Sequence, residues 1–317
     1  MGSKVTIKDV FLPPQIVRMR RNIFLAFISS VLFLQVSFGQ NFSEDQRNEL
    51  NIADPGVDFV IAGGIYMGGA KAAGYYGGYP QNELNLNYVF KNEYWKRDIL
   101  KLITDKNNFV SSTDTTIGIR DYPEKVHYQP AMSVCIGASY RFDEHWRINI
   151  YYTFARLTVK SVFNVNYDNR VPGNDRPEFL SYLLVGKENR SFFDLTGSYT
   201  FQFNKIVKPF LEFGAQFNFV KVKSLDAIIE DREFTLLDRY GGASYVPGMT
   251  EYKPNYGGPG FAVTGVVGVK FAFSKSVSVD PCFYVSFGKV GLNDYKDFHI
   301  NYGAFIRLVL SDAMFAK

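Results

Sequence analysis

Residues 192–222 read FFDLTGSYTFQFNKIVKPFLEFGAQFNFVKV, and this stretch decides the fold. In residues 193–203 every second residue is apolar, aromatic or glycine, and small or polar residues lie between them. The same alternation returns in residues 209–222, after the short interruption at 204–208. A period of two places the two sets on opposite faces of an extended chain. The stretch therefore predicts two antiparallel strands joined by a tight turn.

The alternation occurs eight times between residues 57 and 310. The apolar positions fall in residues 59–67, 132–142, 148–154, 193–203, 211–219, 261–273, 277–287 and 300–310. The connections at 143–146, 204–208 and 274–276 are short, and they alternate with those at 71–129, 168–190, 223–259 and 289–298. A soluble β-sandwich also alternates, but it has no reason to sort its connections in this way. We predict an all-β protein, an eight-stranded antiparallel up-and-down transmembrane β-barrel with periplasmic turns and long extracellular loops.

A ten-stranded barrel is the alternative. It requires residues 84–95 and 109–119 to be strands, but Ser111, Thr113 and Thr115 would make a poor lipid-facing row. Residues 92–104 instead show helical spacing of apolar side chains and are predicted as a helix, whereas 82–91 stay ambiguous. Eight strands are therefore preferred.

The N-terminal segment has the pattern of a cleaved signal peptide. Arg18, Arg20 and Arg21 precede the apolar run 23–34, and small residues suited to cleavage end at Gly39. We predict a signal peptide over 1–39, with a possible start at 19, and a periplasmic segment over 40–56. The barrel would span 57–310 and a periplasmic tail 311–317. This organisation predicts export to the bacterial outer membrane, with contact to its lipid.

Composition excludes several classes of function. The chain of 317 residues has 35 basic and 31 acidic residues, and its whole net charge of +4 comes from residues 1–39. The mature part is formally neutral, so we expect no nucleic-acid partner. The three histidines are His127, His145 and His299, and no serine–histidine motif or metal-ligand spacing accompanies them. We therefore expect no enzyme activity, no catalytic residue, no metal and no cofactor.

The predicted inward-facing set contains a balanced group of charges. Its members are Arg141, Asp194, Glu212, Lys270, Asp280 and Arg307. Because an eight-stranded barrel is only wide enough for side chains, we expect these cations and anions to pair and plug the lumen. A charged constriction of a narrow pore is the alternative. Cys135 and Cys282 also face inward, on strands that are not neighbours, so a disulfide between them is not expected.

The long connections are rich in glycine and aromatic residues. The candidate protein-contact residues are Tyr75, Tyr76, Tyr79, Trp95, Tyr240, Tyr245, Tyr252 and Tyr256. Tyrosine combined with glycine is typical of protein-contact loops. For the loop that carries Tyr240, Tyr245, Tyr252 and Tyr256, an irregular cap over the barrel mouth is the alternative reading, and the placement of residues 71–129 stays open.

The ending Ser37-Phe38-Gly39-Gln40 of the leader resembles that of exported Bacteroidota proteins. Repeats such as FGAQF at 213–217 and VVGVKF at 266–271 are similar in style to their small outer-membrane β-barrel proteins. Some of those barrels are accessory parts of export or assembly machines, including type IX secretion. The resemblance therefore implies a structural or accessory subunit of an envelope complex. One departure is the end of the chain, where Phe315 is followed by two further residues instead of closing the sequence.

The residues and the resemblance together predict a non-enzymatic barrel that contacts other envelope proteins through its loops and wall, in secretion or outer-membrane assembly. Two alternatives remain at this point. One is a narrow pore or small-ligand uptake channel, and the other is a surface binder that uses its extracellular loops.

Overall fold

The computed structural model describes residues 55–107, 116–168, 179–203, 206–237, 256–274, 276–293, 295 and 297–312. The predicted signal peptide, nearly all of the 40–56 segment and most of the predicted C-terminal tail lie outside the described residues. Tyr240, Tyr245 and Tyr252 also lie outside them.

Eight antiparallel strands close into a ring, in the order β4-β3-β1-β10-β9-β8-β6-β5 and back to β4. The ring strands are β1 (Gly56–Met67), β3 (Ala131–Arg141), β4 (Trp146–Asp168), β5 (Phe179–Thr200), β6 (Val207–Ile229), β8 (Pro259–Ala272), β9 (Val277–Gly288) and β10 (His299–Ser311). The eight-stranded all-β prediction is confirmed. Closure pairs every barrel strand on both sides and leaves the barrel without a free edge.

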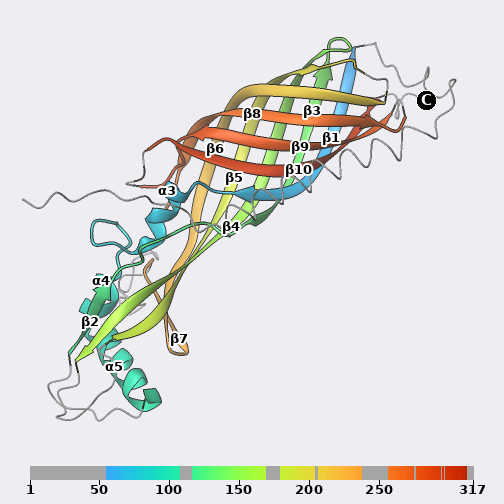
Figure 1. Ribbon diagram of the computed structural model, residues 1–317. Helices are drawn as coiled ribbons and strands as arrows, with labels where there is room; N and C mark the ends of the chain where they lie inside the picture. The colour runs from blue at the N-terminus through green and yellow to red at the C-terminus, as the bar shows by residue number, and fades with distance from the viewer. Residues whose placement is uncertain are drawn as a thin grey trace, which may run out of the picture.

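The first and last strands seal the ring. Phe59 lies opposite Leu310, and Met67 lies opposite Tyr302. Near the chain ends, the Val57 amide donates to the Asp312 carboxylate at 3.2 Å. The short turns lie at the same end of the barrel as the start of β1 and the end of β10, at the upper right of Figure 1. The described parts of the long connections lie at the other end.

Three strands continue well beyond the rest of the ring. β4, β5 and β6 have 22 or 23 residues each, whereas the other ring strands have 11 to 14. Their far ends form a protrusion, with β2 (Thr116–Asp121) beside β4 and β7 (Arg232–Thr235) beside β6. The protrusion runs to the lower left of Figure 1.

The protrusion corrects the prediction that 168–190 and 223–259 are loops throughout, since residues 179–190 and 223–229 belong to strands. The reason is that the apolar side chains change from the outward face of the strands in the barrel to the inward face in the protrusion. In the barrel the apolar residues of β6 face outward, as at Phe217 and Phe219, whereas in the protrusion the inward residues Leu225 and Ile229 are the apolar, buried ones. The apolar side chains change face where the strand no longer has apolar surroundings on its outer side and instead covers an apolar core on its inner side.

Short helices cover the inner side of the protrusion and the barrel mouth. They are α3 (Ala70–Ala73), the 3₁₀ turn η1 (Gly74–Gly77), α4 (Asn87–Lys91) and α5 (Glu93–Asn107). The predicted helix at 92–104 is confirmed by α5, and the ambiguous 82–91 contains α4. Within the second candidate strand, 109–119, β2 does form from Thr116 onward, but it lies outside the ring. No helix in the described ranges is both long and apolar enough to cross a membrane.

One hydrophobic core connects the barrel interior to the protrusion. It includes Tyr66 and Phe305 in the barrel, Tyr76 at the mouth, and Phe163 and Ile99 in the protrusion. The protrusion is therefore packed as a continuation of the barrel.

Candidate functional site

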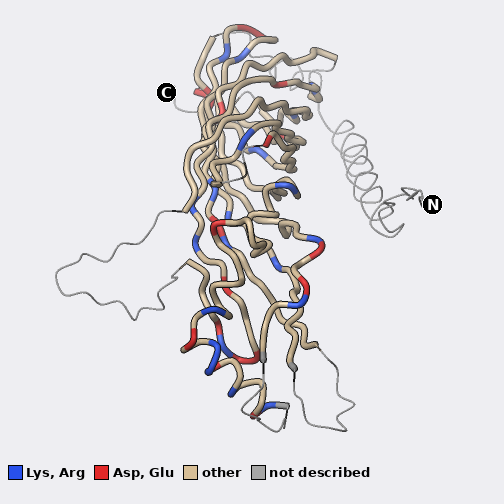
Figure 2. The backbone as a smooth tube through the Cα atoms, turned by 90° about the vertical axis from the view of Figure 1, so that its left-hand side faces the viewer, with Lys and Arg blue, Asp and Glu red and all other residues tan. Residues whose placement is uncertain are grey.

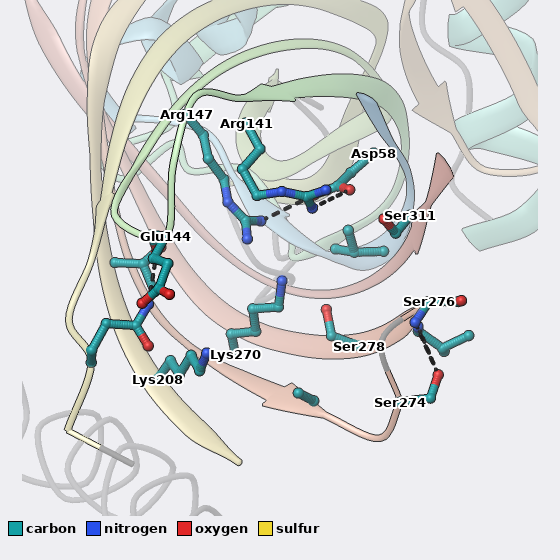
Figure 3. Close-up of a pocket in the computed structure, with 15 residues that line it drawn as sticks. Asp58, Arg141, Glu144, Arg147, Lys208, Lys270, Ser274, Ser276, Ser278 and Ser311 are labelled. Atoms are coloured by element: carbon teal, nitrogen blue, oxygen red, sulfur yellow. Dashed lines mark hydrogen bonds and ion pairs between the residues drawn. The ribbon is translucent and has the colours of Figure 1, made fainter. Parts of the chain in front are cut away.

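A cluster of charges fills the short-turn end of the lumen. The Arg141 guanidinium lies 2.8 Å from the Asp58 carboxylate, and Arg147 lies 3.4 Å from the other oxygen of Asp58. Both arginines reach toward Asp58 across a small cavity, and Lys270 points into the same space (Figure 3). That cavity is about 30 Å³, which is room for about one or two waters.

A second group of polar side chains crosses the middle of the lumen. Arg307 on β10 donates to both carboxylate oxygens of Glu212 on β6, at 2.6 and 3.1 Å. The guanidinium also stacks 4.6 Å from the centre of the Tyr151 ring, and it donates to the Tyr151 hydroxyl at 3.2 Å. Paired and stacked in this way, the buried arginine has partners on two other strands. The two cavities beside it are about 20 Å³ each.

The structure places all six predicted lumen charges on the inner side of the ring strands, but it does not simply pair them with each other. Arg307 and Glu212 form an ion pair. Arg141 instead pairs with Asp58, a residue outside the predicted set, and Asp194 accepts a hydrogen bond from Gln216 at 2.7 Å. Asp280 lies directly across from Arg307 on the neighbouring strand. The alternation of its strand already placed Asp58 on the inner face, so the sequence could have predicted Asp58 as a further lumen charge.

A third network closes the outer mouth of the lumen. Arg190 and Glu188, both on β5, form an ion pair that has no exposed side-chain surface. Tyr76 from η1 donates to the Glu188 carboxylate at 2.5 Å, and Tyr128 donates to the same oxygen at 3.1 Å. Arg190 also donates to Tyr66 of β1 at 3.2 Å. The network therefore ties the strand wall to the segment that folds over the mouth.

Sequence reasoning missed the pair of Glu188 and Arg190 because it placed both residues in a loop. Once residues 179–190 are recognised as a strand, their spacing of two puts them on one face. The lumen then contains stacked polar layers from the short-turn end to the mouth, and the three small cavities described above each have room for about one or two waters.

Helix α5 packs on the inner face of the protrusion. Ile99 and Ile103 are fully buried, and Trp95 contacts Phe234 of β7 with ring centres 5.8 Å apart. At the exposed rim, Lys106 lies 3.1 Å from both Glu230 and Asp231. Hydrogen bonds to these two carboxylates raise the pKa of Lys106. Burial raises the pKa of Tyr182, whose hydroxyl donates to Glu230 at 2.9 Å.

The predicted contact surface needs correction at three of its aromatic residues. Tyr75 and Tyr76 have no exposed surface, and Tyr256 is buried. All three belong to the hydrophobic core that continues from the lumen into the protrusion. Tyr79 and Trp95 are half-buried. Burial raises the pKa of Tyr79, which donates to the Pro123 carbonyl at 2.7 Å.

The histidines and cysteines do not gather into a chemical site. His299 is buried and its Nδ1 lies 3.1 Å from the Asp297 carbonyl, whereas His127 is exposed. Cys135 and Cys282 are both buried free thiols. Within the described part of the chain, no group of three or more His, Cys, Asp or Glu side chains is placed to hold a metal ion.

The outer wall of the ring is an apolar belt. Exposed large apolar residues occur on all eight strands; examples are Ile61, Val134, Ile150, Leu195, Phe213, Val267, Phe283 and Ile306. Aromatic residues gather toward its two ends, including Trp146 and Tyr199 at the short-turn end and Phe261 and Phe298 at the other, each pair being part of a ring cluster. An apolar band with aromatic girdles around a polar interior is the arrangement that a bilayer requires.

No protein-family model matches the chain, and no curated protein matches it. Among solved structures it is similar to Neisserial surface protein A, with 10% identity, coverage of 80% of this chain and 95% of that one, and a TM-score of 0.38. It is also similar to outer membrane protein OprG from Pseudomonas aeruginosa, with 7% identity, 82% and 95% coverage, and a TM-score of 0.34. Ail, the attachment invasion locus protein of Yersinia pestis, in complex with the heparin analogue sucrose octasulfate, has 9% identity, 81% and 98% coverage, and a TM-score of 0.29.

These likenesses concern the fold alone. The closed ring, its polar interior and its apolar belt make this chain a small transmembrane β-barrel of the outer-membrane type.

Proposed function

We propose that this barrel resides in the bacterial outer membrane as a non-enzymatic structural or accessory subunit of an envelope complex, in secretion or outer-membrane assembly. The observation that carries the proposal is the core that continues from the lumen into the protrusion. A filled lumen leaves the outer surfaces for function, and a firmly packed protrusion can present a fixed contact surface.

The outer face of the protrusion offers an apolar contact. Val162 of β4 lies opposite Leu183 of β5, which in turn lies opposite Ile228 of β6. Val162 and Leu183 are 51% and 45% exposed, beyond the apolar belt of the barrel. Exposed apolar rows outside a bilayer mark protein-contact sites. The partner expected here is therefore another envelope protein.

The test is a pull-down of the tagged protein from detergent-solubilised outer membranes, followed by identification of the bound proteins by mass. We expect a fixed, stoichiometric set of envelope proteins. The variant with Val162→Thr and Leu183→Thr should lose them. Asn164 and Ser181 are the neighbouring outward pair, so Asn164→Thr with Ser181→Thr is the matched control and should keep them. Wild-type protein that purifies alone would contradict the proposal.

The protrusion also supports the second candidate, a surface binder. Its edge strands β2 and β7 each pair on one side within the described residues, so each leaves backbone groups available for a ligand. A surface binder would purify alone and would bind from the outside. The pull-down therefore separates the two candidates.

The pore alternative has no supporting observation in the described lumen. Planar-bilayer recording tests it directly, and we expect no steady conductance from the full chain. Reproducible single-channel currents would contradict the filled-lumen proposal.

A further inference from the structure

We propose that the outer face of β4, β5 and β6, just beyond the apolar belt, binds the phosphate groups of an anionic glycolipid in the outer leaflet. The binding residues would be the basic collar, which we define as Arg156, Lys160, Lys187, Lys221 and Lys223. This inference rests on the membrane location proposed above and adds a ligand class to it.

The collar begins where the apolar belt ends. On the outer face, Phe154, Ser191 and Phe219 form one cross-strand row. The next row consists of Arg156, Asn189 and Lys221. One step along the strands therefore changes the outward side chains from aromatic to basic.

At the same step, the apolar side chains change from the outer face of the strands to the inner face. On the barrel side of this step, the outward-facing Phe217 and Phe219 are exposed. From the step toward the protrusion, the inward-facing Val220 and Val222 are buried. The reversal shows where the apolar surroundings of the barrel end, which is the level of lipid headgroups. Lys and Arg at this level lie beside phosphate groups, for which they are the usual partners.

A β-bulge concentrates charge in the following row. Lys187 lies opposite Ser224, and Glu188 lies opposite Val222, so Lys223 is the extra residue of β6. Both lysines are exposed. The bulge therefore adds an exposed lysine next to the residue opposite Lys187, and an anion bound at this row would be near both charges.

All five collar cations are exposed. None of the five forms an ion pair with another described residue. Glu188 points inward to Arg190. Among the described carboxylates, Asp226 faces outward at the edge of the collar nearer the protrusion, in the same cross-strand row as Lys160. Figure 2 shows Lys and Arg positions on neighbouring strands part-way along the molecule, between the barrel and the protrusion.

The occupant we infer is a lipid because the cations border the apolar belt on its outer side. A ligand held there can insert its acyl chains along the barrel wall while its phosphates meet the collar. A soluble anion would use only the charges and would gain nothing from the neighbouring Phe154 and Phe219.

The experiment uses the full chain in phosphatidylcholine nanodiscs that contain increasing amounts of diphosphorylated lipid A. Bound lipid A is counted by native mass spectrometry after release into mild detergent. The test variant carries Lys187→Gln, Lys221→Gln and Lys223→Gln. The matched control carries Lys91→Gln, Lys96→Gln and Lys101→Gln on α4 and α5. Heat-modified gel mobility and a β-type circular dichroism spectrum establish that each variant is folded.

We expect the test variant to bind lipid A about 100-fold more weakly, because each cation near an anionic surface contributes about a fivefold factor. The control variant should bind like the wild type, and added salt should weaken wild-type binding. Equal binding by the wild type and the test variant would overturn the inference, as would an equal loss in the control.

Two competitors identify the source of the anion. Inorganic phosphate at the same phosphate concentration should not displace lipid A, and displacement would overturn the lipid assignment. Heparin bound through the same three lysines in preference to lipid A would overturn it in favour of a sulfated polysaccharide. If the wild-type chain did not insert into nanodiscs, the proposed membrane location would fail. Insertion without a preference for lipid A would overturn only this inference.

Discussion

Glu188 and Arg190 lie two residues apart on β5, point to the same side of the strand and form an ion pair with no exposed side-chain surface. Tyr66, Tyr76 and Tyr128 complete their hydrogen bonds from three other segments. The pair therefore holds the mouth segment onto the barrel wall. Its burial makes it sensitive to the loss of either charge, because the remaining ion would be left without its partner.

We expect Glu188→Ala to lower the free energy of unfolding by about 3–5 kcal/mol, because it leaves the buried Arg190 guanidinium without its carboxylate partner. Replacement of both residues, as Glu188→Leu with Arg190→Met, should cost less than the single change. Urea unfolding of the barrel in detergent micelles measures both. A single variant as stable as the double variant would contradict the buried-pair explanation.

Gly214 and Gly197 provide a matched test of strand packing. A Cβ at Gly214 would lie 2.0 Å from the Leu195 carbonyl oxygen of the adjacent strand, whereas nothing lies within 4 Å of a Cβ at Gly197. We expect Gly214→Ala to destabilise the barrel by about 1–3 kcal/mol, because β5 and β6 must separate. Gly197→Ala should leave the unfolding midpoint nearly unchanged. Equal midpoints would contradict the close approach.

The turn between β3 and β4 should loosen in acid. Backbone amides of Trp146 and His145 donate to the Asp143 carboxylate at 2.7 Å and lower its pKa. A lowered pKa means that the stabilisation is present above the ordinary value of 3.8 and is lost as the pH falls through the folded-state value.

Trp146 fluorescence in a Trp95→Phe background measures this change, since the chain has two tryptophans. Asp143→Asn keeps an acceptor oxygen but has no carboxyl to titrate, so its signal should stay flat over the same acidic range. An acid transition identical in both proteins would assign the effect to another group.

The attachment of α5 to the protrusion depends on buried isoleucines. We expect Ile103→Ala to cost about 2–5 kcal/mol of local stability, since Ile103 is fully buried. Limited proteolysis should then cut within residues 93–107, while the heat-modified mobility of the barrel stays unchanged. Lys101→Ala on the exposed face is the control. Equal cleavage of both variants would show that α5 is not held by this contact.

Several features could be predicted from alternation alone. Phe213, Phe217 and Phe219 on one face, with Glu212 and Gln216 on the other, required a half-apolar strand, and the strict order of short and long connections required a closed barrel. Residues 92–104 had helical spacing and form α5. The predicted roles of the tyrosines failed at Tyr75 and Tyr76 because burial depends on what folds over the barrel mouth.

The sequence by itself determined the number of strands, their order around the barrel and which side chains of the predicted strand segments face the lumen, because a period of two and the turn lengths are local properties of the chain. Only the tertiary structure decided that β4, β5 and β6 continue into a protrusion, since their apolar face reverses and needs the long-range partners Ile99 and Phe234. It also decided that Arg141 pairs with Asp58 across 83 positions. Strand register brings such residues together, and register depends on every strand in the closed ring.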